Sequence, residues 1–493
     1  MVSNERQNSS YSATFSLREL KRDWLLLLSL LIFFAINLWN IVHRLYPDDI
    51  QRRSFYTFQA ARMLSGHFSV PNDYLGGECF ITNVPNYCQG YFGITPSIVR
   101  IPILLLTGNP DKQFVVYSWT LALLSLVIGI AIWVYVLLPQ FLHTMPNRVA
   151  VISLFVSITF LSSRPMVYEE AIIWGLSLSF LGTALIALTW KKFTWARLAL
   201  AVIISILALL SRPTIGIAPS VMFFFFWLVL VLSTNKISTA SDLPIYSQNS
   251  YLKSSVLLAS MMGPLVYLLV NELKFGSITP DLSKHANLMY DTFQLAHFQN
   301  SGLFNLSTLP TKVKESIAFP GLHFGSDFPW LSIRSRVIRP IWPATSTSND
   351  VYPFGEFSSL WVFATPILLI AGFILIRNLA WKTFTNLPPS PKFELHVKWA
   401  TLASFLVPMI LIFSFPGFTA RYVYDVIPFL FVAILFFGTS YSQTNNFFRR
   451  TTICVLIFLS LMFQILCVGL VSREFGCTAG GEKIPAAESC LIW

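Results

Sequence analysis

The apolar run Trp24–Val42 (WLLLLSLLIFFAINLWNIV) is followed three residues later by Tyr46–Asp49 (YPDD). A run of about nineteen apolar residues can cross a bilayer as a helix. Basic residues stand before this run at positions 18, 21 and 22, and basic residues mark the cytoplasmic end of a span. We therefore expect Asp48 and Asp49 at the outer surface. Charge beside hydrocarbon is costly, so this carboxylate pair is a candidate functional site.

The composition is that of a polytopic membrane protein. The chain has 493 residues, of which 54% are hydrophobic and 12% charged, whereas soluble proteins carry about 25% charged residues. The net charge of +11 fits basic cytoplasmic loops that meet anionic headgroups. We find no soluble basic module, so no nucleic-acid partner is expected. The first span is expected to stay in place as an uncleaved anchor.

The hydropathy pattern predicts an all-α fold with about eleven transmembrane helices in the plasma membrane. The N-terminus is expected in the cytoplasm and the C-terminus outside. The expected spans are Trp24–Val42, Phe114–Leu138, Val149–Ser162, Ala171–Trp190, Trp195–Leu210, Thr214–Leu232, Ser255–Leu273, Ser359–Ile376, Trp399–Phe415, Val426–Ser440 and Thr452–Val471. They divide the chain into a cytoplasmic tail (1–23), an N-terminal transmembrane module (24–273), an outer segment (274–358), C-terminal transmembrane helices (359–472) and a short outer tail (473–493).

The outer loop 43–112 in the N-terminal module contains a predicted interfacial helix, Gln51–Ser65, which Gly66 can end. Its expected apolar face comprises Tyr56, Ala60, Met63 and Leu64, and Arg52, Arg53, Gln59 and Arg62 lie elsewhere around it. The run Ile98–Leu106 is too short to cross the membrane and is interrupted by Arg100 and Pro102. We interpret it as a re-entrant or surface piece.

Four cysteines lie in predicted outer segments. Cys79 and Cys88 share one loop, and Cys477 and Cys490 share the C-terminal tail. Pairs of this kind form disulfides in an oxidising compartment. Four unrelated thiols are the alternative, and the spacing does not exclude it.

Charged residues gather at the predicted outer ends of the spans. They are Asp48, Asp49, Arg100, Arg164, Glu169, Glu170, Arg212, Arg421 and Asp425. The arginines can be snorkelling anchors, and the acids can cap helices or sit at their positive ends. In the functional interpretation, the guanidinium groups grip a phosphate. A carboxylate then acts as a general base, and arginine stabilises the leaving phosphate.

Other chemistries lack their motifs. The chain has no GxxxxGK[ST] loop, no HExxH and no Cys/His cluster with zinc spacing. No predicted cytoplasmic loop is long enough for a nucleotide-binding domain. An ATP-driven pump and an enzyme that uses a nucleotide sugar are therefore disfavoured.

At these residues the chain resembles the GT-C superfamily of membrane glycosyltransferases. The matching segments are Asp48-Asp49 with Phe55–Gly66 (FYTFQAARMLSG), Gly93–Ser97 (GITPS) with Arg100, Asn271 with Phe275–Ser277 (FGS), and Arg421-Tyr422 with Asp425 and Pro428. The segments are spread over most of the chain, and their order and sidedness agree with the family. One departure is the outer tail, which is short here although many members carry a large soluble domain there.

The resemblance implies an outer-face enzyme that moves a sugar from a polyprenyl-phosphate donor to a glycan, lipid or protein acceptor. By this resemblance Asp48 or Asp49 is the catalytic base. The donor phosphate would be held by Arg421, with Arg212, Arg164 and Arg100 as further candidates. Acceptor-binding or supporting roles fall to Glu169, Glu170, Tyr422 and Asp425. A divalent cation, Mg²⁺ or Mn²⁺, is compatible with the Asp48–Asp49 pair, although the sequence shows no complete ligand set.

Two other functions are compatible with the same residues. A transporter or flippase for a lipid-linked saccharide would use the arginines to grip a phosphate, and it would need a polar path across the membrane. A non-catalytic subunit of an envelope assembly would use segment 274–358 to bind a partner.

Overall fold

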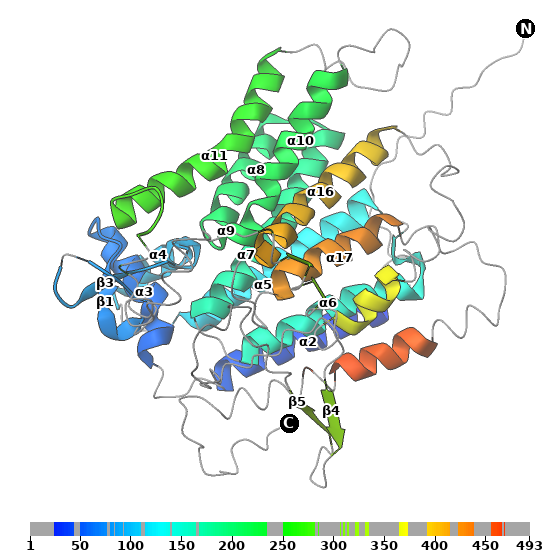
Figure 1. Cartoon of the computed structure of the whole chain (residues 1–493), viewed down its shortest axis with the longest axis horizontal. Helices are drawn as coiled ribbons and strands as arrows, with labels where there is room; N and C mark the ends of the chain where they lie inside the picture. The colour runs from blue at the N-terminus through cyan, green and yellow to red at the C-terminus, as the bar shows by residue number, and fades with distance from the viewer. Residues whose placement is uncertain are drawn as a thin grey trace, which may run out of the picture.

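We analysed a computed structural model of the chain. It describes residues 24–43, 50–75, 79–82, 84–91, 93–109, 114–138, 141–163, 167–233, 250–281, 284, 306, 309–310, 313–314, 321–324, 331–334, 364–372, 392–414, 423–437, 455–465 and 468. Within these residues the chain is mainly helical, and the long helices pack against one another in a bundle (Figure 1).

The helices, in chain order, are α2 (Trp24–His43), α3 (Ile50–Leu64), α4 (Thr95–Thr107), α5 (Val115–Ala131), α6 (Met145–Ser163), α7 (Val167–Lys191), α8 (Trp195–Leu209), α9 (Pro213–Gly216), α10 (Ala218–Ser233), α11 (Ser250–Phe275), α16 (Lys392–Ser414) and α17 (Val423–Phe437). A π-helical turn, Ile132–Leu137, continues α5, and short 3₁₀ turns occur at Asn72–Tyr74 and Phe141–His143. A further apolar helix covers Val455–Ile465.

Five helices of the described part are long and apolar enough to cross a membrane. They are Val115–Leu137, Val167–Lys191, Pro213–Leu232, Ser250–Phe275 and His396–Ser414. Six shorter apolar helices accompany them: Leu26–Val42, Thr95–Thr107, Met145–Thr159, Trp195–Leu209, Val423–Phe436 and Val455–Ile465. The expectation of a multi-pass helical membrane protein is therefore confirmed at this level. The count of eleven spans stays a prediction.

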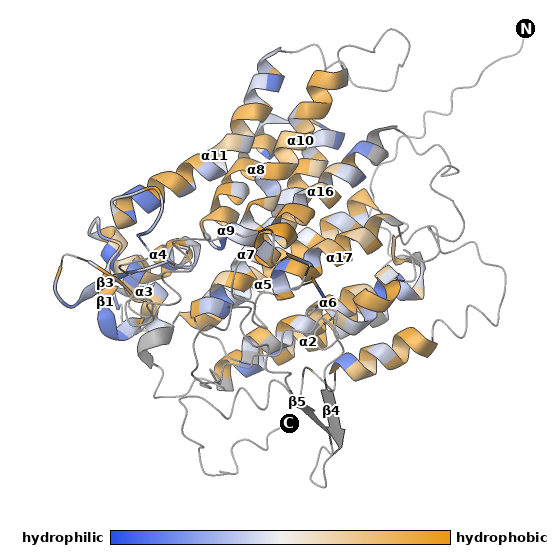
Figure 2. Ribbon diagram, in the orientation of Figure 1, coloured by the Kyte–Doolittle hydropathy of each residue, from blue (hydrophilic) through white to orange (hydrophobic). Residues whose placement is uncertain are grey.

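Helix α7 forms the centre of the bundle, with α5, α8 and α10 packed around it. It is apolar on every side and its side chains are nearly all buried, as expected for a core helix. Gly182 brings α7 close to α10, because an added Cβ would lie 2.9 Å from Pro219. By contrast, α11 exposes an apolar stripe that includes Leu258, Leu265 and Leu269. In Figure 2 several stretches of the α11 ribbon carry the colour of hydrophobic residues. Such a stripe is suited to lipid.

The outer loop of the N-terminal module contains a small sheet that we did not expect. Its strands β1 (Val70–Pro71), β2 (Cys79–Ile81) and β3 (Tyr87–Gly90) pair antiparallel in the order β1-β3-β2. The Cys79–Cys88 disulfide joins β2 to β3, with Cα atoms 5.6 Å apart. A second hairpin pairs β4 (Gly321–Phe324) with β5 (Leu331–Arg334).

Two helices of the outer loop differ in detail from the expectation. Helix α3 begins at Ile50 and ends before Gly66, whose φ is +77°. Its buried face includes the polar Gln59, whereas Leu64 is half exposed, because α3 packs on α4 as well as on the sheet. Helix α4 runs without a break through Pro102. The apolar run at Ile98–Leu106 is therefore part of a regular helix.

Candidate functional site

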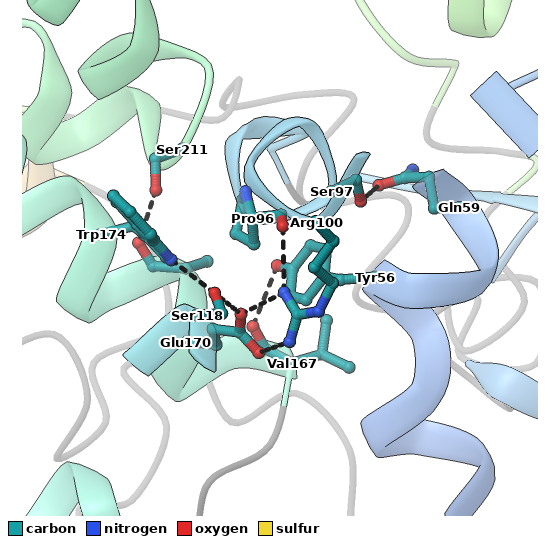
Figure 3. A network of polar contacts seen from close by, with 11 residues as sticks. Tyr56, Gln59, Pro96, Ser97, Arg100, Ser118, Val167, Glu170, Trp174 and Ser211 are labelled. Carbon is teal, nitrogen blue, oxygen red and sulfur yellow. Dashed lines mark hydrogen bonds and ion pairs between the residues drawn. The ribbon is translucent and has the colours of Figure 1, made fainter. Parts of the chain in front are cut away.

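The described charges of the predicted outer ends meet at one end of the helix bundle. The first turns of α5, α7 and α17 reach this end, together with the junction between α8 and α9. Figure 3 shows Tyr56, Arg100, Ser118, Glu170 and Trp174 pointing toward one another from α3, α4, α5 and α7. Each element brings one or two polar side chains to this point, so the site exists only when the bundle is assembled.

Arg100 and Glu170 form a buried, two-pronged ion pair. The Arg100 side chain is fully buried and that of Glu170 is 2% exposed. Nη2 of Arg100 lies 2.9 Å from Oε2 of Glu170, and Nη1 donates to Oε1 of Glu170. The Ser118 hydroxyl also donates to Glu170, and the Trp174 indole Nε1 donates to Ser118 Oγ at 2.9 Å. The carboxylate is thus held by two elements besides its own helix.

The same arginine and its neighbours anchor α3. Arg100 Nη1 donates to the Pro96 carbonyl at 3.0 Å, and the guanidinium lies 5.5 Å from the Tyr56 ring centre. The Tyr56 hydroxyl donates to the Val167 carbonyl at 3.0 Å. Ser97 Oγ donates to Oε1 of Gln59 at 2.7 Å, so α3 is fixed to α4 as well as to α7. Because Ile50 opens α3, the acid pair Asp48-Asp49 directly precedes a rigidly held helix.

The electrostatics around Tyr56 show that the charges share one region. Burial raises the pKa of the Tyr56 phenol well above its usual value, and the negative charge of Glu170 raises this pKa further. Arg100, Glu169 and Arg212 also act on this hydroxyl. Tyr56 therefore stays neutral and keeps its hydrogen-bond donor at physiological pH.

A second ion pair joins α17 to the α8–α9 junction. Nη2 of Arg212 lies 2.8 Å from Oδ2 of Asp425, and Nε lies 3.1 Å from Oδ1. The Thr214 hydroxyl donates to Oδ2 at 3.2 Å. The Asp425 side chain is fully buried, but that of Arg212 is 12% exposed. Of the two arginines in these ion pairs, Arg212 is the one with access to a ligand.

Close backbone approach places this second pair beside the first. Ser211 Oγ donates to the Ala171 carbonyl at 3.0 Å, one residue from Glu170. A Cβ added at Gly175 would lie 2.8 Å from Cβ of Arg212, so only glycine leaves room there. Glu169 completes the group, and its charge also acts on Tyr424 of α17. These five ionisable side chains, Arg100, Glu169, Glu170, Arg212 and Asp425, are called the charge cluster below.

The positive ends of three helices nearly balance the net negative charge of the charge cluster. It holds three acids and two arginines, and the acids of α7 and α17 lie in the first turns of their helices. A helix N-terminus carries about half a positive charge. Three such ends meet here, and they offset the one excess carboxylate.

The structure brings together Arg100, Glu169, Glu170, Arg212 and Asp425, which the sequence analysis selected one by one. The pairings were not predicted: the two arginines assigned to a phosphate contact acids that we had assigned to other roles. Asp48, Asp49, Arg164, Arg421, Tyr422, Cys477 and Cys490 lie outside the described residues, so their roles stay predictions. Among the described residues, no group of three or more His, Cys, Asp or Glu side chains could hold a metal ion. The cation assigned to Asp48 and Asp49 also stays a prediction.

Sequence reasoning missed the uncharged members of the site. Ser118 and Trp174 were treated as ordinary residues of apolar spans, yet both complete the Glu170 network. Trp174 stands four residues after Glu170, on the same helix face, and this spacing was the available signal. No family model matches the chain, and no curated protein matches it.

Proposed function

We propose that the protein is an integral membrane glycosyltransferase of the plasma membrane. It transfers a sugar from a polyprenyl-phosphate donor to a glycan, lipid or protein acceptor at the outer face. The observation that supports this most is the convergence of the charge cluster with α3, the helix that directly follows Asp48-Asp49.

One of the two acids that precede α3 in the sequence, Asp48 or Asp49, supplies the base. A carboxylate at position 48 or 49 removes the proton from the acceptor hydroxyl as the donor phosphate leaves. The anchoring of α3 through Tyr56 and Gln59 supports this role, because a base must be held within hydrogen-bond reach of the proton.

The arginine at the α8–α9 junction supplies charge for the leaving group. Arg212 retains exposed surface while Asp425 and Thr214 fix its orientation. An oriented guanidinium stabilises the negative charge that develops on a phosphate. Arg100 has no such access, since its side chain is fully buried against Glu170. We therefore assign Arg100 to holding α4 and α7 together.

The placement of the other charges favours an enzyme over a transporter. In the five long apolar helices, the charged side chains lie within about two turns of a helix end. A transporter needs polar groups near the middle of the membrane for its cargo. The charge cluster instead lies at one end of the bundle, where a lipid-borne headgroup would arrive.

Transfer by purified protein in lipid tests the proposal. Asp48→Asn, Asp49→Asn and the double variant are offered radiolabelled polyprenyl-phosphate sugars and an envelope acceptor. Asp73→Asn, an exposed acid of the same outer loop, is the matched control. We expect at least one single variant and the double variant to lose transfer, with Asp73→Asn active. Full activity in the double variant would remove the base assignment.

A further inference from the structure

A cleft lies away from the charge cluster, at the far end of α3. Its volume is about 380 Å³, within the usual range of about 300–1,000 Å³ for small-molecule sites. The turn after α3, the strands β2 and β3, and the end of α11 enclose it. No residue of the charge cluster lines this cleft.

One wall of the cleft combines aromatic rings with a buried amide. Phe80 of β2 and Gln89 of β3 are cross-strand partners and therefore share a face of the sheet. The opposite face carries Cys79 and Cys88, which pack against α3. Phe275 of α11 faces Phe80, with ring centres 5.3 Å apart. Phe80 is only 4% exposed, so the partly exposed ring of Phe275 is the aromatic face that a ligand in the cleft can reach.

Gln89 has hydrogen-bonding capacity that the described residues do not use. Its side chain is only 8% exposed, and its Oε1 has no hydrogen-bond partner among them. A buried polar atom without a partner costs about 1–3 kcal/mol. A hydrogen-bond donor on a ligand that reaches this acceptor would satisfy it, and a sugar hydroxyl is such a donor.

The charged residues that line the cleft are Lys274 of α11, Lys284 and Asp281, with His67 beside them. The Lys274 side chain is buried, and its nitrogen donates to the Gly90 carbonyl at 2.6 Å, which ties α11 to the sheet. Lys284 is exposed. A negative group on a ligand would therefore meet the Lys284 ammonium.

The geometry points to a saccharide with an anionic substituent as the ligand of this cleft. The C–H face of a sugar ring packs on the negative face of an aromatic ring, here Phe275. Its hydroxyl groups can donate to Gln89, and its acidic group faces Lys284. If the protein is the proposed transferase, the cleft is a docking site for the acceptor glycan, and that role alone depends on the proposed function.

Binding can be measured without turnover. Full-length protein in lipid nanodiscs is titrated with D-glucuronate, methyl β-D-glucoside and inorganic phosphate, and saturation-transfer NMR reports contact with each sugar. We expect glucuronate to bind more tightly than the neutral glucoside, and both sugars to compete for one site. Phosphate, followed by ³¹P NMR, should displace glucuronate only weakly.

Substitutions of cleft residues test whether the NMR signal of the bound sugars comes from the cleft. Gln89→Leu should weaken the binding of both sugars about fivefold, which corresponds to the loss of roughly one hydrogen bond. Lys284→Ala should weaken the binding of glucuronate alone. Lys192→Ala, which changes an exposed lysine just after α7, should alter the binding of neither sugar. Phe275→Leu keeps an apolar side chain against Phe80 but removes the ring face, so it should reduce the binding of both sugars.

Two results would overturn the inference. The first is sugar binding that is unchanged in Gln89→Leu and Phe275→Leu. The second is phosphate binding as tight as that of glucuronate, which would indicate a plain anion site or a lipid headgroup. If the unmodified protein binds the sugars in this cleft but transfers no sugar from any donor, the result counts against the proposed function and not against the cleft.

Discussion

Substitution of Glu170 by glutamine tests whether the buried ion pair holds the site together. The change leaves the size of the side chain almost unaltered but removes the negative charge beside Arg100. The Arg100 guanidinium is fully buried and cannot lose its charge in a protein. Glu170→Gln therefore leaves an uncompensated charge among α4, α5 and α7.

The size of the effect follows from the burial of the pair. Removing one partner of a buried ion pair lowers the free energy of unfolding by about 3–5 kcal/mol. Exposures of 0% and 2% place this pair fully in that class. Arg100→Met should cost less than Glu170→Gln, because a lone carboxylate can take up a proton. The double variant Arg100→Met/Glu170→Met should be more stable than Arg100→Met alone or Glu170→Met alone, since apolar replacement of a whole pair is often nearly neutral.

Unfolding by SDS in mixed micelles, followed by tryptophan fluorescence, gives these free energies. Lys191→Met is the control, because Lys191 is exposed at the other end of α7 and exposed substitutions stay within about 0.5 kcal/mol. A loss below about 1 kcal/mol in Glu170→Gln would refute the reasoning. A double variant whose loss equals the sum of the two single losses would also refute it, because uncoupled residues add.

Two further predictions concern the surroundings of the charge cluster. Gly175→Ala should lower the free energy of unfolding by about 1–3 kcal/mol, since the new Cβ would lie 2.8 Å from Cβ of Arg212; Gly372→Ala, which meets no atom within 4 Å, should be neutral or slightly stabilising in the same assay. Tyr56 has a raised pKa in the folded protein, so it binds its proton more tightly when folded, and stability should fall as the pH rises above about 10. Tyr56→Phe should show a shallower decline between pH 9.5 and 11.5, and an unchanged slope would contradict the assignment.

Local patterns predicted the helices better than the contacts between them. The apolar periodicity after Gln51 and the glycine at position 66 foretold α3 almost to the residue. The burial of Gln59 could not be foreseen, because its partner Ser97 lies on another helix, 38 positions later. The strands of the outer loop are only 2–4 residues long, too short for an alternating pattern to appear.

The candidate site shows the same division. Sidedness along the chain predicted that the charged residues lie at one end of the spans, and the described ones do meet there. Which charge faces which could not be read from the sequence, because Arg100 and Glu170 are 70 residues apart and Arg212 and Asp425 are 213 apart. Arg100 is the clearest example of a residue whose role the sequence could not decide. An arginine in a short apolar run suits a ligand site or a buried pair equally well, and only the packing of α4 on α7 distinguishes them.

The fate of the donor is the most direct test of the proposed function. Purified protein in liposomes is given a polyprenyl-phosphate sugar labelled in both the sugar and the phosphate, together with an acceptor. A glycosyltransferase releases free polyprenyl phosphate in a one-to-one ratio with labelled acceptor, and the Asp48→Asn/Asp49→Asn variant releases none. Movement of intact donor between the leaflets, without cleavage by the unmodified protein or by the double variant, would contradict the account and identify a flippase.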